Sequence, residues 1–322
     1  MSDRSKSIEG AIGRPGQVFL REVIAGLSST PKTLPTRFLY DARGSELFEQ
    51  ITELDVYYPT RTEIGILETA APEWVAKLSP GTVLVEFGSG SSVKTELLLA
   101  ASDEITTYVP IDVSRAALAE ASQRLRARFP ALEVVPVIGD FSALALPAEI
   151  MQRPLAGFFP GSTIGNFEPD EAIGLLRSFS QVLAPRGRLL IGVDLRKDRA
   201  TLEEAYDDAE GVTAAFNLNL LRRMKRELSA DLDLDGFEHL ACYNAAKGRV
   251  EMHLVSRRPQ VIEVAGHRFE IAEGERIHTE NSHKHTLAGF AAMAEQAGWR
   301  TEDVWTDDAG LFSVHGLVLA TG

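Results

Sequence analysis

Cysteine is almost absent from this chain, with Cys242 as the single thiol among 322 residues. One cysteine excludes an internal disulfide and is typical of proteins in a reducing cytoplasm, where we expect this one to reside. The surrounding stretch HLACYNAA supplies no group that would activate a thiol. We therefore interpret Cys242 as a small packing residue rather than as a nucleophile.

Long apolar runs and basic stripes are also missing. No run approaches the roughly 18 residues of a membrane span, and the N-terminal MSDRSKSIEG carries no hydrophobic signal region. The net charge of −13 argues against binding to a nucleic-acid backbone, because no basic stripe is available to displace counterions. We expect a monomer with no membrane or nucleic-acid partner and a small polar or zwitterionic ligand.

A series of alternating strands and helices occupies residues 82–194. Its strands are apolar runs without strict alternation, which is typical of a parallel sheet covered on both faces. The sequence therefore predicts an α/β fold with a Rossmann-like core, whose five strands lie in TVLVEFGSG, TTYVPIDVS, LEVVPVIGDF, LAGFFPGSTIGNF and GRLLIGVDL.

The segments around this series differ from it. Before it, GSELFEQITEL predicts a helix capped by Ser45, and the next helix is expected to start at Thr60 or Thr62. After it, residues 195–284 combine helical segments, with a break near Gly211, and alternating segments typical of antiparallel strands. These roughly 90 residues have the length of a small domain. A helix and two closing strands follow.

The first strand of the series ends in a glycine turn, Glu86-Phe-Gly-Ser-Gly90. Ligands of open α/β sheets bind at such carboxyl ends. The turn lacks the third glycine of a dinucleotide fingerprint, because Val93 stands in its place, and no phosphate loop is present. Asp112, at the end of the second strand, can accept from both hydroxyls of a ribose, and Asp140-Phe141 can bind an adenine. Together these features predict a nucleoside without a pyrophosphate, S-adenosylmethionine (SAM).

Other residues of the turn have matching predicted roles. Glu86 is expected to orient the turn of Gly88, Ser89 and Gly90, and Lys94 to cap it or to pair with the methionine carboxylate. Acidic residues at strand ends commonly cap helices, so each feature alone has a plain structural explanation. Their order on successive strands favours a SAM-dependent methyltransferase.

Eight motifs extend this interpretation beyond the fold. In chain order they are FLYDARGSELFEQIT, YYPTRTE, VEFGSGSSVKT, FPGSTIGNF, AYDDAEGVTAAFN, LSADLDLDGFEH, VEMHL and IHTENSHKH. They resemble the histidine-specific Nα-methyltransferases of ergothioneine biosynthesis, from about residue 18 to the C-terminus. The segment ENSHKH departs from the family in carrying His283 and His285 where aromatic residues are common.

The resemblance implies a class I SAM-dependent methyltransferase core of residues 60–194 and 285–322. A smaller α+β domain of residues 15–59 and 195–284 would close over it, and residues 1–14 are expected to be flexible. The implied activity is trimethylation of the α-amine of L-histidine to hercynine, the first step of ergothioneine biosynthesis. The implied cofactor site contains Tyr40, Gly88, Lys94, Asp112, Asp140 and Phe141. The implied amino-acid site contains Tyr57, Gly161, Asn166, Tyr206, Met252, Glu280 and Ser282.

The reaction itself constrains the catalytic candidates, which are Tyr40, Tyr57 and Asn166. The attacking amine must lose a proton before each transfer, and a tyrosine hydroxyl or water can relay it. The aromatic faces of the two tyrosines can stabilise the quaternary product. Asn166 offers a donor and acceptors to the amino and carboxylate groups.

Structural explanations for the same residues stay open at this point. Tyr40, Tyr57, Tyr206 and Met252 could be packing residues, Asn166 could cap the helix that starts near Pro169, and Glu280 with Ser282 could form a surface turn. His278, His283 and His285 match no ligand pattern, so we expect no metal. The functional alternatives are a different amino acid or an indole derivative as acceptor, a non-catalytic SAM-binding protein and, last, a nicotinamide-dependent reductase.

Overall fold

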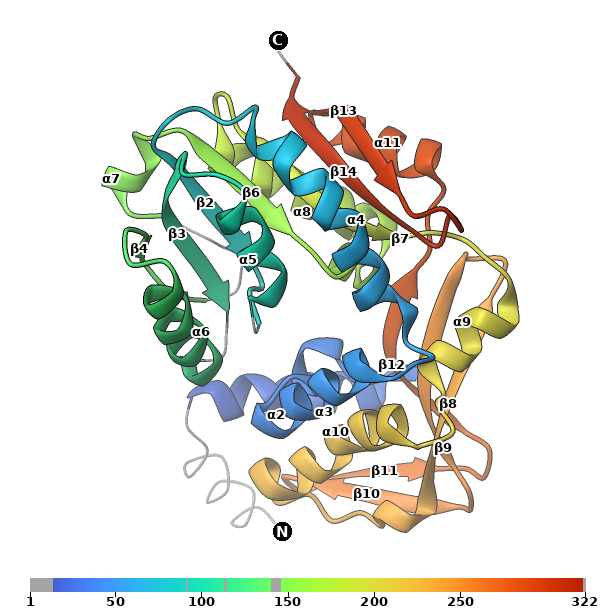
Figure 1. The fold of residues 1–322 in the computed structure, drawn as a ribbon. Coiled ribbons are helices and arrows are strands. Elements are labelled where there is room, and N and C mark those ends of the chain that lie inside the picture. The colour runs from blue at the N-terminus through green and yellow to red at the C-terminus, as the bar shows by residue number, and fades with distance from the viewer. Residues whose placement is uncertain (1–13, 91, 113–114, 140–145, 321–322) are drawn as a thin grey trace. The chain divides into compact units, whose positions relative to one another are not determined.

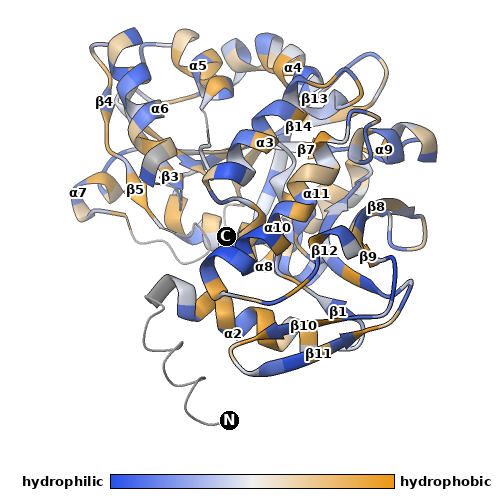
Figure 2. Cartoon of the chain, turned by 90° about the horizontal axis from the view of Figure 1, so that it is seen from below, coloured by the Kyte–Doolittle hydropathy of each residue, from blue (hydrophilic) through white to orange (hydrophobic). Residues whose placement is uncertain are grey.

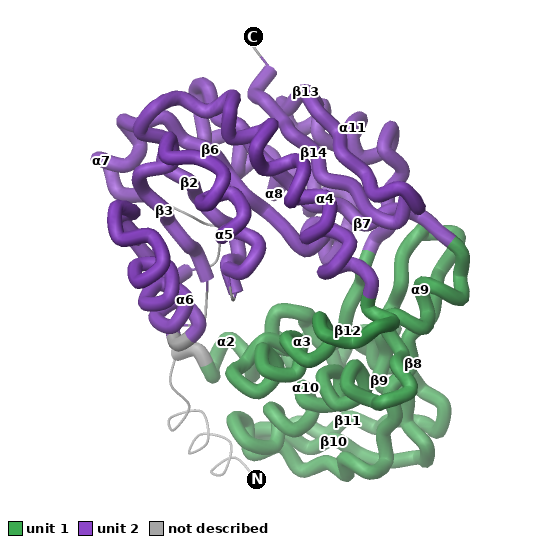
Figure 3. The backbone as a smooth tube through the Cα atoms, in the orientation of Figure 1, with its two compact units in different colours: residues 1–57, 198–282 green, residues 58–197, 283–322 purple. Residues whose placement is uncertain are grey.

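The chain divides into two compact units, shown in green and purple in Figure 3. The computed structural model describes residues 14–90, 92–112, 115–139 and 146–320 (Figure 1). Unit 1 comprises residues 1–57 and 198–282, and unit 2 comprises residues 58–197 and 283–322. The predicted domain limits differ from these by two or three residues at each of the three points where the chain passes from one unit to the other. Residues 1–13, most of the segment predicted to be flexible, lie outside the described part.

Unit 2 contains the predicted βα series. Its helices are α4 (Tyr58–Val75), α5 (Val93–Ala100), α6 (Arg115–Arg128), α7 (Ala148–Met151), η3 (Thr163–Asn166), α8 (Pro169–Leu183) and α11 (Leu287–Gln296). Its strands are β2 (Thr82–Phe87), β3 (Ile105–Asp112), β4 (Glu133–Val134), β5 (Val137–Ile138), β6 (Leu155–Phe159), β7 (Arg188–Asp194), β13 (Trp299–Thr306) and β14 (Phe312–Leu319). The α/β prediction is confirmed.

The strands of unit 2 form one sheet in the order β13-β14-β7-β6-β2-β3-β4, with β5 also paired to β3. The pairs β7–β6, β6–β2 and β2–β3 are parallel, whereas β14 runs antiparallel to β7 and to β13. Parallel neighbours end at the same edge, so Phe87, Asp112, Phe159 and Asp194 mark one carboxyl edge. The predicted third strand is observed as two short ones, β4 and β5, rather than as one continuous strand.

Both faces of this sheet are covered, which explains the uninterrupted apolar runs. Along β2, Val83, Val85 and Phe87 pack with α8 and α11, and Leu84 packs on the opposite face with α4, α5 and α6. Glu86 shares the parity of Leu84 and is buried. The helices that cover the sheet carry hydrophobic and hydrophilic residues side by side, as α5 and α6 show in Figure 2. Because Glu86 points to the same apolar layer as Leu84, its carboxyl group is an exception there.

Unit 1 combines helices with strands of both directions. Its helices are α2 (Arg14–Ser28), η1 (Thr36–Leu39), α3 (Ala42–Glu53), α9 (Arg199–Tyr206), α10 (Val212–Leu228) and η4 (Leu234–Gly236). Its strands are β1 (Lys32–Thr33), β8 (Phe237–Asn244), β9 (Arg249–Ser256), β10 (Gln260–Val264), β11 (His267–Ile271) and β12 (Arg276–His283). They form a four-stranded sheet, β1-β12-β9-β8, and the hairpin β10–β11. The pairs β8–β9 and β10–β11 are antiparallel, as predicted, whereas β1 pairs with β12 in parallel. The predicted break at Gly211 separates α9 from α10, with φ of +75° at that glycine.

Two predicted helix starts are wrong. The side chain of Asp41, not Ser45, caps α3 by accepting from the Gly44 N–H at 2.8 Å. Helix α4 begins at Tyr58, ahead of both Thr60 and Thr62. Across the described ranges, none of the helices combines the length and the apolar character needed to cross a membrane.

Candidate functional site

The glycine turn after β2 folds back onto the end of β3, within unit 2. The Ile111 carbonyl accepts from the N–H groups of Gly88 and Ser89 at 2.9 and 3.0 Å, and the Gly90 N–H donates to Asp112 at 3.0 Å. Both glycines have positive φ, +76° and +48°, which favours residues without a Cβ. The predicted cofactor residues of these two strands therefore lie together. Asp140 and Phe141 lie outside the described residues.

This arrangement fits a nucleoside ligand. No Cβ is present at Gly88 or Gly90, so backbone can approach a ligand closely at the turn. The buried hydroxyl of Ser89 has no hydrogen-bond partner among the described residues. Asp112 is only partly buried and ends its strand with a carboxylate at the edge of the sheet. The Ser89 hydroxyl and the Asp112 carboxylate thus place one donor and one acceptor at this edge, which are groups that a nucleoside can use.

Glu86 lies beneath the turn in an apolar layer. Thr95 donates to its carboxyl at 2.5 Å, and the Tyr108 hydroxyl donates to the same oxygen. Burial is the largest influence and raises the pKa of Glu86 to about 8, although these hydrogen bonds and Lys94 oppose the change. Asp112 adds to the rise. The hydrogen bonds of Glu86 therefore tie the end of β2 to α5 and β3, and its predicted role in orienting the turn stays a prediction.

We expect replacement of Glu86 by glutamine to flatten the dependence of stability on pH. The folded pKa of about 8 exceeds the ordinary value of 4.5, so the native state binds more protons between these values. The stabilisation is therefore complete below pH 4.5 and is lost as pH rises toward 8. Its size is on the order of a few kcal/mol. Denaturant unfolding at pH 5 and pH 8.5 measures it in wild type, Glu86→Gln and the exposed control Glu120→Gln. A glutamine variant that keeps the wild-type pH slope would contradict this account.

The second predicted loop, residues 161–166, is held within unit 2 by hydrogen bonds of the Ser162 hydroxyl and carbonyl and by close packing at Gly165. Gly161 has φ of +80°, and Ser162 accepts from the Asp194 N–H at 2.9 Å. A Cβ at Gly165 would lie 2.8 Å from the His283 carbonyl oxygen, so only glycine fits there. Asn166 ends η3 and does not cap α8, because Glu168 fills that position in a capping box with Glu171. The structural explanation for Asn166 is thus excluded.

Lys94 and Gly161 share a partner that the sequence did not reveal, Glu63 of α4. Its carboxylate accepts from the Gly161 N–H at 3.0 and 2.9 Å and forms an ion pair with Lys94. Glu63 is fully buried. The motif YYPTRTE contains it, but spacing alone could not show what a glutamate 98 residues from Gly161 would contact.

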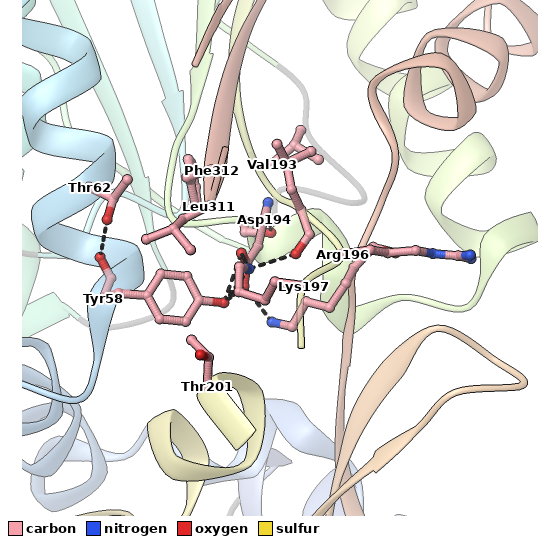
Figure 4. Close-up of polar contacts among 12 residues, drawn as sticks. Tyr58, Thr62, Val193, Asp194, Arg196, Lys197, Thr201, Leu311 and Phe312 are labelled. Carbon is pink, nitrogen blue, oxygen red and sulfur yellow. Dashed lines mark hydrogen bonds and ion pairs between the residues drawn. The ribbon is translucent and has the colours of Figure 1, made fainter. Parts of the chain in front are cut away.

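Asp194 is a second buried carboxylate that sequence reasoning missed. Lys284 and Lys197 each place an ammonium 2.6 Å from it, and the Tyr58 hydroxyl donates to it at 2.8 Å. Figure 4 shows the side chains of Tyr58 and Lys197 directed toward Asp194. Burial alone would raise the pKa of Asp194, but the two ammonium groups outweigh it and hold that pKa below its ordinary 3.8. Burial also lowers the pKa of Lys197 to about 8.

The predicted acceptor residues of unit 1 gather around β12. Glu280 and Ser282 lie two residues apart on this strand and are buried, which excludes a surface turn. The hydroxyls of Ser282 and Tyr206 are 2.8 Å apart, and the Tyr40 hydroxyl donates to Glu280 at 3.5 Å. Burial, followed by the nearby Glu280, raises the pKa of Tyr40 well above its ordinary 10.0. Tyr40 is therefore a hydrogen-bond donor at neutral pH.

Aromatic rings surround these polar groups. Tyr40 lies 5.6 Å from Phe48 and 5.4 Å from Phe216 between ring centroids, and Tyr57 lies 5.9 Å from Tyr206. The pairs are close to edge-on, the usual arrangement of packed aromatic rings. Phe48 and Phe216 were not predicted, although both stand inside quoted motifs. Met252 is buried in β9, and its carbonyl accepts from Thr279 of β12 at 3.0 Å.

The histidines considered as ligands belong to both units, His278 to unit 1 and His283 with His285 to unit 2. His278 contacts Asn281 at 2.9 Å in unit 1, and His285 packs edge-on against Phe290 in unit 2, where burial lowers its pKa to about 4. The described residues do include one group with metal-ligand atoms near one another, Cys242, Glu251 and His253. The guanidinium of Arg249 lies 2.8 Å from Glu251 and would repel a cation there.

Comparisons with known proteins identify the family. A family model described as "Histidine-specific methyltransferase, SAM-dependent" matches residues 19–319. The chain is 45% identical over 305 residues to a histidine N-alpha-methyltransferase of Mycolicibacterium smegmatis, covering 93% of this chain and 94% of that protein. It is 40% identical over 309 residues to the enzyme of the same name in Mycobacterium tuberculosis, with the same coverage.

A third relative is longer than this chain. Ergothioneine biosynthesis protein 1 of Neurospora crassa is 32% identical over 289 residues, covering 86% of this chain and 32% of that protein. The predicted methyltransferase activity and the predicted cofactor, SAM, are confirmed by the family match. Because that match spans nearly the whole chain, this protein belongs to the histidine-specific, SAM-dependent methyltransferases.

Proposed function

We propose that this enzyme transfers three methyl groups from SAM to the α-amine of L-histidine, giving hercynine in the first step of ergothioneine biosynthesis. Membership of the family supports histidine as the acceptor. The observation that carries the proposal is the pair of buried polar side chains, Glu280 and Ser282, set two residues apart on β12 among aromatic rings.

We assign selection of the imidazole to this pair. Side chains two apart on a strand point to the same face, so Glu280 and Ser282 can serve the two ring nitrogens. Glu280 accepts from an imidazole N–H, and the Ser282 hydroxyl, already paired with Tyr206 at 2.8 Å, can turn to the other nitrogen. An apolar side chain such as leucine would leave both groups unpaired, which disfavours it.

We assign the amino and carboxylate groups to other residues of the predicted set. Asn166 offers both a donor and acceptors, the Gly161 loop provides backbone groups, and Tyr206 and Tyr57 offer hydroxyls. These assignments extend the family resemblance onto residues whose contacts within each unit are described above.

The chemistry calls for alignment and an unprotonated amine. When bound, SAM supplies a methyl group on a sulfonium, from which a neutral thioether leaves. The acceptor amine must give up a proton before each transfer, and water or a tyrosine hydroxyl relays it. Tyr40 holds its own proton tightly, so we assign it no role as an obligatory base. The aromatic faces of Tyr40 and Tyr57 stabilise the quaternary ammonium product.

Product masses test the proposal directly. The enzyme is incubated with SAM and each common amino acid, and with an indole amine in a separate reaction. We expect mono-, di- and trimethylated histidine, ending in the trimethyl species, because a quaternary nitrogen has no lone pair. Absence of methylated histidine would refute the proposal. Methylation of another acceptor would assign a different substrate, and binding of S-adenosylhomocysteine (SAH) without any turnover would indicate a non-catalytic protein.

A further inference from the structure

A charged residue interrupts the apolar face of α4. Ile66, Leu67 and Ala70 follow Glu63 at helical spacings of three, four and seven and belong to the core beneath the sheet. Glu63 is 0% exposed, and burial of a carboxylate is unfavourable unless it is paired and hydrogen-bonded. Such an exception to the pattern of a helix usually marks a functional requirement.

All partners of Glu63 that the structure gives belong to the predicted binding residues of unit 2. Both carboxylate oxygens accept from the Gly161 N–H, at 3.0 and 2.9 Å, and one of them pairs with the Lys94 ammonium. A Cβ on Gly161 would lie 3.7 Å from Lys94 Nζ. Glu63 thus joins two groups, one assigned to the cofactor and one to the acceptor, that lie side by side.

The sheet is shaped to admit this carboxylate. A Cβ on Gly192 of β7 would lie 1.9 Å from Glu63 Oε1, so any side chain at position 192 would displace it. Gly192 pairs with Val314 of β14 in continuous register, so the strand pairing itself does not require a glycine there. Glycine weakens a strand interior, and here its absent side chain leaves room for Glu63.

We propose that Glu63 is a positioning residue that fixes the Lys94 ammonium and the Gly161 amide in one geometry and thereby couples cofactor binding to acceptor binding. This inference rests on the proposed function, in which Gly161 meets the amino acid, and on the expectation that Lys94 pairs with the methionine carboxylate of SAM rather than only capping the turn. Without the carboxylate, the lysine loses its anchor and the turn at Gly161 loses the acceptor for its N–H.

Calorimetric titrations test this inference with SAH alone, and with histidine in the presence and absence of SAH. Glu63→Gln keeps the side-chain shape, but its amide cannot be a charged partner for Lys94. We expect SAH to bind about 10- to 100-fold more weakly, the effect of losing one hydrogen bond to a charged group. We also expect the factor by which SAH tightens histidine binding to approach one.

Three further variants separate positioning from folding. Gly192→Ala should reproduce the effect by displacing the carboxylate while its charge remains, and Glu63→Asp should restore part of the SAH affinity. Glu68→Gln makes the same chemical change at an exposed site of α4 and should bind like wild type. Thermal unfolding of each variant reports the fold.

The outcomes distinguish this inference from the proposed function. Wild-type SAH affinity in both Glu63→Gln and Gly192→Ala would overturn the inference, whatever their melting temperatures. If Glu63→Gln does not fold, the SAH affinities of Gly192→Ala and Glu63→Asp decide whether Glu63 positions Lys94. If wild type methylates no histidine, the proposed function fails, and the titration with SAH alone still decides the role of Glu63 toward Lys94.

Discussion

Glu280→Ala should lower kcat/KM for histidine by at least about 100-fold while leaving SAH affinity near that of wild type. Glu280 is buried on β12, and its loss removes the acceptor proposed for the imidazole N–H. The alanine variant would also leave the Tyr40 hydroxyl, now 3.5 Å from Glu280, without this acceptor. Release of SAH measures turnover, and calorimetry with SAH measures cofactor binding.

A matched control and a second acceptor sharpen this test. Glu270 lies on β11 of the same unit with an exposed side chain, and Glu270→Ala should behave like wild type. Turnover of an apolar amino acid should change little in Glu280→Ala, so the preference for histidine should collapse. Histidine turnover within about threefold of wild type would show that Glu280 does not select the imidazole.

Asp112→Ala is expected to weaken SAH binding by about 100-fold. The carboxylate is proposed to accept from both ribose hydroxyls, and hydrogen bonds to a charged group contribute about 1.5–3 kcal/mol each. Its removal also frees the Gly90 N–H, which donates to Asp112 at 3.0 Å. Titration with SAH requires no acceptor, so this result is independent of the histidine assignment.

The control for this variant is Asp103→Ala, in the exposed loop between α5 and β3. It should retain wild-type SAH affinity and melting temperature. Asp112→Asn separates the contributions further, because an amide oxygen can still accept from the Gly90 N–H but presents no charge to the sugar. If Asp112→Ala binds SAH as tightly as wild type does, the assignment of the ribose to this residue is wrong.

Local pattern predicted much of this fold. Apolar runs separated by helical segments predicted the parallel strands of unit 2, since burial on both faces leaves a direct signature in sequence. The break at Gly211 and the two closing strands were also predicted from local pattern, and the structure shows the strands to be antiparallel. The errors have local causes. Asp41 caps α3 four residues before Ser45 by accepting from the Gly44 N–H. Strands β4 and β5 have two residues each, too few for a period to define them.

The residues of the candidate site likewise divide into those that local pattern predicted and those that it did not. The glycine turn and Asp112 were predicted because strand ends in a parallel sheet meet at one edge. Glu63, Asp194, Phe48 and Phe216 were not, because their meaning depends on partners distant in sequence. Tyr58, for example, reaches Asp194 across 136 positions. For Glu280 and Ser282 the chemistry was suggested by the resemblance, and spacing alone would have favoured a surface turn.

The ion cluster at Asp194 bears on how relatives of this enzyme could be recombined. An exchange of unit 1 requires three splice points, after Tyr57, after Lys197 and after Ser282. Each lies within two residues of a side chain that contacts Asp194: Tyr58, Lys197 or Lys284. A junction shifted a few residues into unit 2 would exchange one of these partners of buried Asp194, a hydroxyl at the first junction and an ammonium at the other two. Grafts of acceptor specificity should therefore keep all three residues with the recipient.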